Sequence, residues 1–112
     1  MVNKSKYTWI VQFYSPNCIY CKRFEPEYEL TADKLQNTNI KVGRVDAVQY
    51  DDFSARYNIN SYPTIKLFHP GSFVPEDYHG PRKSNNIIEA AINYAQNKSR
   101  REYNEPDVFE PV

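Results

Sequence analysis

The sequence is poor in several features that would mark a specialised class of protein. Its 112 residues include only two cysteines and three glycines. It has no run of about 20 apolar residues, the length that a helix needs to cross a bilayer. Fourteen basic residues balance fourteen acidic ones, so no global field attracts nucleic acid or an anionic membrane. We therefore expect neither nucleic-acid binding nor membrane contact.

The composition that remains is that of a folded domain. Hydrophobic residues make up 40% of the chain and aromatic residues 15%, with ten tyrosines among them. A chain of this length is expected to form one domain with its own core. The polar start, Met1 to Lys6, is not a secretory signal. Two interpretations follow: a cytosolic protein, or an excerpt of a longer chain whose signal lies upstream.

Hydrophobic patterning predicts alternating strands and helices, and so an α/β fold. Residues 7–14 resemble a strand buried on both faces, and the helix that follows contains Pro26, which should kink it. Strands joined by helices predict parallel crossovers, whereas the last two strands predict an antiparallel edge. The expected strands are 7–14, 40–46, 64–68 and about 77–79, with a turn at 69–72, and the expected helices are about 18–35, 51–57 and 84–97.

The end of the chain differs in composition from the rest. Residues 105–112, Glu-Pro-Asp-Val-Phe-Glu-Pro-Val, combine two prolines with three acidic residues. We therefore divide the chain into a domain over residues 1–99 and a C-terminal tail or linker over residues 100–112.

The two cysteines form a single Cys-x-x-Cys motif, Cys18-Ile19-Tyr20-Cys21. The motif follows a buried strand directly and opens a helix, and Asn17 is a good candidate for the N-cap. Free N–H groups and the positive dipole end of a helix stabilise an anion. Cys18 is therefore expected to react as a thiolate, and the more buried Cys21 to resolve the mixed disulfide.

Two other interpretations of the motif stay open. Structural zinc needs four ligands, and the motif supplies two, while the histidines, His69 and His79, lie on a distant hairpin. We expect no metal. A structural disulfide that closes so short a loop contributes little stability through loop entropy. Redox chemistry is the favoured interpretation, and the reactive group is then the Cys18–Cys21 disulfide itself, with no further cofactor.

The order of the motifs resembles a thioredoxin-fold domain of the protein disulfide isomerase family. The resemblance implies an α/β fold with a mixed, mostly parallel sheet flanked by helices, and it covers the chain from about Tyr7 to Asn97. It is carried by four segments: Val11 to Tyr28 with the cysteine pair, Val45-Asp46-Ala47, Tyr57 to Ile65, and Tyr78-His79-Gly80-Pro81-Arg82.

The resemblance also implies roles for particular residues. Pro63 would follow a cis peptide bond and face the cysteine pair, and the backbone of Tyr62 would pair with an extended substrate segment. Ile19 and Tyr20, between the cysteines, would adjoin the same substrate. Arg82 would approach Cys21 and lower its pKa.

Two departures from the family pattern concern the surroundings of the cysteines. Gln12 stands where the family usually places a buried carboxylate that accepts the proton of the inner thiol. Because glutamine does not titrate, we expect slower turnover. Asn17 stands where a tryptophan is usual, so we expect a wetter site in which the side-chain oxygen of Asn17 competes with the Cys18 thiolate for backbone donors.

A third departure lies between the cysteines, where the isomerases usually carry Gly-His and this chain has Ile19-Tyr20. A histidine at that place stabilises the thiolate and makes the pair oxidising. Its replacement predicts a weaker oxidant with reductase-like behaviour.

The fourth departure is at the start of the chain. Family members carry roughly 20 more residues before the first strand, forming an edge strand and a helix, and this chain has only residues 1–6 there. Without that unit the strand at 40–45 would have an open edge, which invites pairing. Residues 107–110 could fill the edge, although the composition favours a linker.

Together these observations predict a thiol–disulfide oxidoreductase that acts on cysteine-containing polypeptides, with other domains in a longer chain of the endoplasmic reticulum lumen. A thiol or disulfide partner would supply or remove electrons. The alternative is a redox-weak binding module that recruits clients or partners, which Gln12, Asn17 and Ile19-Tyr20 favour. A cytosolic reductant is a third interpretation.

Overall fold

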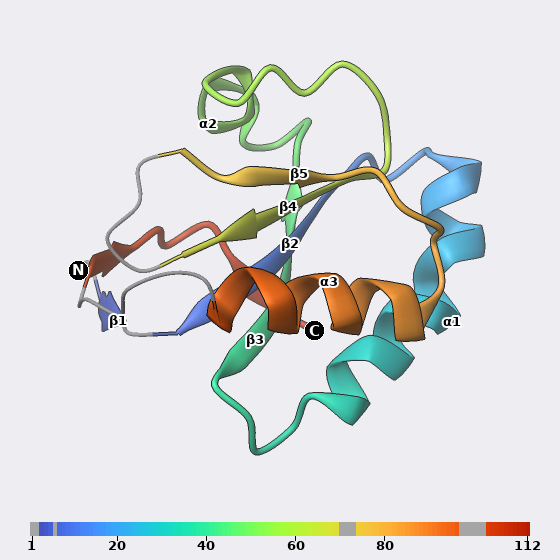
Figure 1. Cartoon of the computed structure of the whole chain (residues 1–112). Coiled ribbons are helices and arrows are strands. Elements are labelled where there is room, and N and C mark those ends of the chain that lie inside the picture. The colour runs from blue at the N-terminus through green and yellow to red at the C-terminus, as the bar shows by residue number, and fades with distance from the viewer. Residues whose placement is uncertain (1–2, 6, 70–73, 97–102) are drawn as a thin grey trace.

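The computed structural model describes residues 3–5, 7–69, 74–96 and 103–112. Two layers of helix enclose a central sheet (Figure 1). The elements in chain order are β1 (Asn3–Ser5), β2 (Thr8–Tyr14), α1 (Ile19–Lys34), β3 (Ile40–Asp46), α2 (Asp51–Ala55), β4 (Thr64–Phe68), β5 (Glu76–Tyr78), α3 (Ser84–Gln96), β6 (Tyr103–Glu105) and β7 (Glu110–Pro111).

The main sheet has five strands in the order β5-β4-β2-β3-β7 and is mixed. Only β2 and β3 are parallel, and the β2–β4, β3–β7 and β4–β5 pairs are antiparallel. The expectation of a mostly parallel sheet is therefore wrong, although the α/β class and the antiparallel β4–β5 edge are confirmed. The parallel strands β2 and β3 end on the same side of the sheet, and the chain stays on that side before β4 begins. Strand β4 therefore starts beside the end of β2 and runs antiparallel to it.

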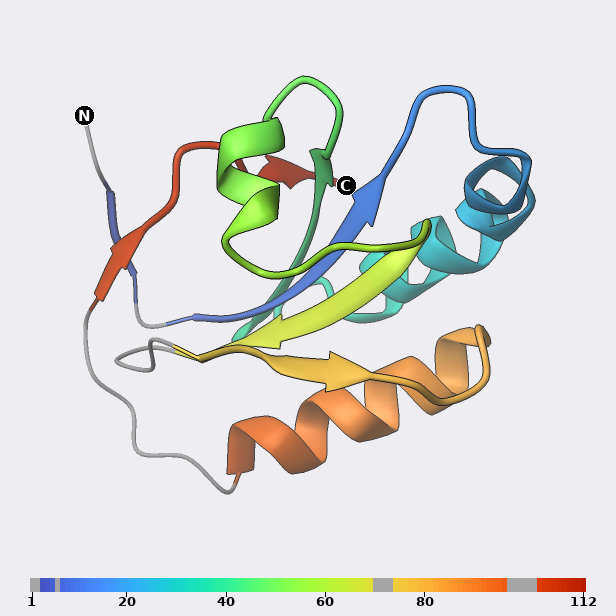
Figure 2. The same cartoon turned by 90° about the horizontal axis from the view of Figure 1, so that it is seen from above.

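Each face of the sheet has its own hydrophobic core. Helices α1 and α3 cover one face, and α2 lies on the other (Figures 1 and 2). The first core joins residues of both long helices to inward residues of the strands, among them Phe24, Tyr28, Ile87 and Ile10. The second core is mostly aromatic, and its buried members are Trp9, Val11, Phe13, Val45, Ala47, Phe68 and Phe109.

Most predicted elements lie within two residues of their expected ends. The strands at 40–46 and 64–68 have the expected bounds, and Pro26 lies inside α1. Helix α2 is shorter than expected, since it ends at Ala55. Most of the predicted turn, 70–72, and the last residue of the final helix, Asn97, lie outside the described residues, as does the 99/100 domain boundary.

Residues 106–112 of the tail pack against the domain, whereas a linker would not. Strand β7 pairs antiparallel with β3 through Gly43 and Arg44, and the Val112 N–H donates to the Val42 carbonyl over 3.0 Å. Phe109 is buried against Trp9, with ring centroids 5.2 Å apart. The tail therefore fills the open edge of β3, which was the alternative that composition disfavoured.

A strand near the start of the chain also pairs with one in the tail. Strands β1 and β6 pair antiparallel as a separate two-stranded sheet beside the main one (Figure 2). Within the described parts of the chain, none of the helices has the length and apolar character needed to cross a membrane.

Candidate active site

The first turn of α1 is capped by a cysteine. The helix begins at Ile19, and the Sγ atom of Cys18 accepts a hydrogen bond from the Cys21 N–H over 3.1 Å. The expectation that Asn17 is the N-cap is wrong. Residues 15–17 form a turn in which the Cys18 N–H donates to the Ser15 carbonyl, so the helix starts one residue later, and Asn17 is exposed. The Cys18 sulfur therefore occupies the position at which a helix N-terminus stabilises negative charge.

Cys18 also contacts the loop that precedes β4. Its thiol donates to the Tyr62 carbonyl oxygen over 3.6 Å, and the Tyr62–Pro63 peptide bond is cis. Because β4 is antiparallel to β2, the start of β4 lies beside the end of β2. That topology brings residues 44 positions apart in the sequence into contact. Tyr62 is half-buried and packs against the aromatic core, while Pro63 is buried.

Cys21 differs from Cys18 in its surroundings. Both are free thiols, but Cys21 is only 6% exposed. Burial, followed by the interaction with Cys18, raises the pKa of Cys21 to about 11, and the positive charge of Arg82 opposes this as the smallest cause. Cys21 is therefore a protonated thiol at neutral pH and must lose its proton before it can attack a disulfide.

A small cavity of about 170 Å³ lies beside Cys21. Gln12, which is 5% exposed, lines it too, so the residue at the position of the expected carboxylate shares this cavity with the inner thiol. Three charged residues also line this cavity, and none of them was identified from the sequence: Lys22, Glu25 and Arg44. The i, i+4 spacing of Cys21 and Glu25 on one helix could have indicated the second of them.

The remaining predicted site residues lie around the end of β2 and the start of β4. Ile19 and Tyr20 are 55% and 59% exposed, which leaves an apolar surface next to Cys18. Arg82 is exposed and lines a second pocket together with Pro63. The structure thus brings the cysteine pair, the Tyr62–Pro63 loop and Arg82 together.

The two histidines do not join the cysteines in a metal site. His69 is buried on the far end of β4, with its ring against Tyr94, and His79 follows β5 with an 86% exposed side chain. Among the described residues there is no group of three or more potential metal ligands. The arrangement is that of a thiol at a helix N-terminus, a buried second thiol in the first turn, and the Tyr62 carbonyl in contact with the first thiol, which is suited to disulfide exchange.

Comparisons with known proteins agree with this geometry. The sequence model of the thioredoxin family matches residues 1–93. Protein disulfide-isomerase A6 of Mesocricetus auratus is 38% identical over 91 residues, which are 81% of this chain and 20% of that protein. Probable protein disulfide-isomerase A4 of Caenorhabditis elegans is 42% identical over 81 residues, which are 70% of this chain and 13% of that protein.

Solved structures give the same result. The first thioredoxin domain of mouse protein disulfide-isomerase A4 superposes with a TM-score of 0.74 at 31% identity, covering 91% of this chain and 70% of that one. The first two thioredoxin domains of Naumovozyma dairenensis Eps1p give a TM-score of 0.68 at 34% identity, covering 76% of this chain and 34% of that one.

Fold and site therefore define a thioredoxin-fold domain with a Cys-x-x-Cys pair. The chain belongs to the thioredoxin family, as a domain of the protein disulfide isomerase kind. It spans about a fifth or less of the length of the curated relatives that it matches.

Proposed function

We propose that this chain carries out thiol–disulfide exchange on cysteine-containing polypeptides, as one domain of a longer protein of the endoplasmic reticulum lumen. The observation that carries the proposal is Cys18, whose sulfur caps α1 and contacts the Tyr62 carbonyl beside the cis bond to Pro63. Its kinship with protein disulfide isomerases supports the reaction type and the compartment.

In the reductive direction, the Cys18 thiolate attacks one sulfur of a client disulfide. A bond forms between Cys18 and that sulfur, the client S–S bond breaks, and the released client thiolate takes a proton from water. Cys21 then loses its proton and attacks Cys18. The Cys18–Cys21 bond forms, the bond between Cys18 and the client sulfur breaks, and the client leaves as a thiolate that takes up a proton in place of the one lost by Cys21. A dithiol partner must reduce the pair for another turnover, and the oxidative direction is the reverse.

The client is held by its backbone in this proposal. An extended segment next to the client cysteine pairs with the main chain at Tyr62, and the exposed side chains of Ile19 and Tyr20 contact it from the other side. Main-chain recognition suits clients of varied sequence. Arg82 acts on Cys21, because its charge lowers the pKa of that thiol.

A second candidate is a binding module with weakened chemistry. The buried Gln12 favours it, because it provides no proton acceptor for a thiol whose pKa is about 11. Reduction of insulin by the chain with a dithiol reductant separates the two candidates. Catalysed precipitation of the insulin B chain supports the oxidoreductase, and a rate equal to that of the reductant alone supports the binding module.

Gln12→Glu should accelerate the step in which Cys21 resolves the mixed disulfide. A carboxylate beside Cys21 would act as general base, and such groups contribute roughly 10²–10⁴-fold where they are well placed, so at least tenfold is expected. The rate is measured in a single turnover, by acid quench and alkylation of a preformed mixed disulfide on Cys18. Gln36→Glu, at an exposed position, is the control and should change nothing. Equal rates for Gln12→Glu and the unaltered chain would refute the assigned role of Gln12.

Replacing Ile19 and Tyr20 together by glycine and histidine should make the pair more oxidising. We expect a reduction potential between about −200 and −270 mV for the unaltered chain and a potential at least about 30 mV higher for the double variant. For a two-electron couple, 30 mV corresponds to about 1.4 kcal/mol. Glutathione equilibria measure both potentials. Tyr20→Phe keeps the ring and should leave the potential unaltered. A potential of the unaltered chain near about −120 mV, as in strong oxidants, would contradict the expectation.

A further inference from the structure

A polar pocket of about 380 Å³ lies on the sheet face that carries α2. Helix α2 covers β2 and β3, whereas β4 and β5 extend beyond it (Figure 2). The loop before β4 forms the wall of the pocket through Asn58, Asn60 and Ser61, and the two strands form its floor. In the described chain no helix lies over β5 on this face, while Lys66 and Phe68 of β4 are buried.

The floor of the pocket follows from strand register. Lys66 pairs with Asp77 across β4 and β5, and Thr64 and His79 lie two residues along on the same face. The residues between them point to the opposite face, where Ile65 is part of the core. The pocket floor is therefore a set of four polar side chains, in contrast to the aromatic core that α2 covers.

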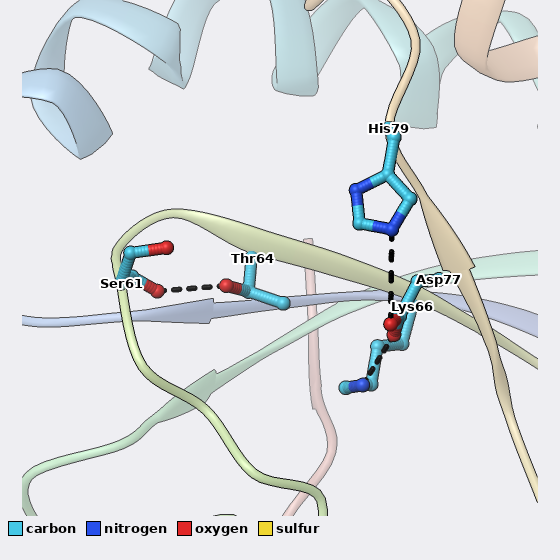
Figure 3. Close-up of polar contacts among 5 residues, drawn as sticks. All are labelled: Ser61, Thr64, Lys66, Asp77 and His79. Carbon is cyan, nitrogen blue, oxygen red and sulfur yellow. Dashed lines mark hydrogen bonds and ion pairs between the residues drawn. The ribbon is translucent and has the colours of Figure 1, made fainter.

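Contacts within the floor are specific (Figure 3). The Lys66 ammonium, whose side chain is only 9% exposed, pairs with the Asp77 carboxylate. The second oxygen of Asp77 lies 3.8 Å from Nε2 of His79, whose side chain is 86% exposed. The Thr64 hydroxyl donates to the Ser61 carbonyl over 2.7 Å and ties the floor to the wall.

Two residues connect this pocket with the cysteines. Pro63 lines it, and the carbonyl before Pro63 accepts from the Cys18 thiol. Arg82 also lines it, and the charge of Arg82 lowers the pKa of Cys21. Lys66 follows Pro63 by three residues, which is about 10 Å along a strand. A client segment joined to Cys18 thus reaches the pocket within about three residues of its own cysteine.

The charges of the pocket select among client side chains. Lys66 and Arg82 are two cations against the single carboxylate of Asp77. Asp77 is engaged by Lys66, whereas Arg82 and His79 are exposed to an incoming group.

We propose that the Lys66–Asp77–His79 pocket is a client subsite that receives an acidic side chain within about three residues of the reacting cysteine. The inference rests on the proposed exchange function and names its preferred substrate class: polypeptides with aspartate or glutamate near the cysteine. The backbone at Tyr62 then holds any client, and the pocket ranks clients by charge.

The test uses disulfide-linked peptides with one cysteine in an alanine–serine background. Glutamate, glutamine or lysine is placed at each of the three positions on either side of that cysteine, and the second-order rate of attack by Cys18 is measured. At one or more positions glutamate should raise the rate about threefold to fivefold over glutamine, the range of a partly exposed ion pair, and lysine should lower it.

Variants then locate the effect. Asp77→Asn removes the competing carboxylate and should increase the preference for glutamate, whereas His79→Glu should abolish or reverse it. Glu76→Gln is matched to Asp77→Asn, since it removes one negative charge from the neighbouring residue of β5, which points to the opposite face of the sheet. It should leave the preference unaltered. Circular dichroism shows whether each variant is folded.

A binding measurement that needs no disulfide exchange separates this inference from the proposed function. Peptides with serine in place of cysteine are titrated into ¹⁵N-labelled protein, and the amide signals of His79 and Gly80 should move with the glutamate peptide more than with the lysine peptide. Equal rates for all three residues at every position would overturn the subsite while exchange itself stands. If no peptide reacts, exchange fails, and the signal shifts alone decide: equal shifts overturn the subsite, and glutamate-selective shifts support it.

Discussion

Cys21→Ser should stop turnover after the first step and leave the client attached to Cys18. Cys18 keeps its place at the N-terminus of α1 and its contact with the Tyr62 carbonyl, so attack on a client disulfide is retained. Serine cannot form the second disulfide, because its oxygen makes no stable bond to sulfur under these conditions. The mixed disulfide is therefore the expected end product.

Cys18→Ser should have a different result, with no client attached and no turnover. The remaining thiol, Cys21, is 6% exposed, and burial, the largest cause of its raised pKa, persists in the variant, so at neutral pH it is a poor nucleophile. Attack by Cys21 should increase with pH up to about its pKa, since the thiolate fraction increases. Non-reducing electrophoresis and mass spectrometry of both variants with a small disulfide-bonded protein measure the adducts. Equal adduct formation by the two variants would contradict the assigned roles.

Phe109→Ala should be the most destabilising substitution in the tail. The Phe109 ring lies 5.0 Å from that of Phe68, 5.2 Å from Trp9 and 6.2 Å from Phe53, measured between ring centroids. Its removal leaves a cavity in the aromatic core, which costs about 3–4 kcal/mol for a buried phenylalanine. It also removes the apolar contact that holds β7 on the edge of β3.

Urea unfolding measures this loss, and Glu110→Ala is the control in the same strand. The Glu110 carboxylate lies 3.9 Å from Arg44 and is 61% exposed, so its removal should cost less than about 1 kcal/mol. If the two variants unfold at the same urea concentration, the tail is not part of the folded core. Loss of stability in Phe109→Ala alone would show that the folded domain includes the tail up to Phe109.

The sequence predicted the elements that carry strong local patterns. The run of β-branched and aromatic residues in β2 and the helical stripe of α3 are both local signals, and the structure has them where they were expected. No local pattern gives the direction of β4, because the 17 residues between β3 and β4 are enough to bring the chain to either end of the sheet. The parallel crossover assumed for it was wrong for that reason.

The same contrast between local and non-local signals holds for the site. The spacing of Cys18 and Cys21 and their place after β2 were sufficient to predict one cysteine at the start of α1 and a more buried one in its first turn. The N-cap was assigned to Asn17 on side-chain preference, whereas the turn at Ser15 decides where α1 begins. The pocket on β4 and β5 depends on cross-strand register, which a single sequence does not reveal. Phe109 is one of two aromatic residues in the tail, with Tyr103, and only its tertiary contacts distinguish it from a linker residue.

The central claim is that Cys18 and Cys21 form a working redox pair. Its most direct test is the equilibrium of the dithiol with glutathione, with timed alkylation to identify the thiol that reacts first. The account predicts rapid labelling of Cys18, slow labelling of Cys21 and a potential between about −200 and −270 mV. Slow labelling of both thiols, or a disulfide below about −300 mV that glutathione does not open, would mean a structural crosslink and would contradict the account.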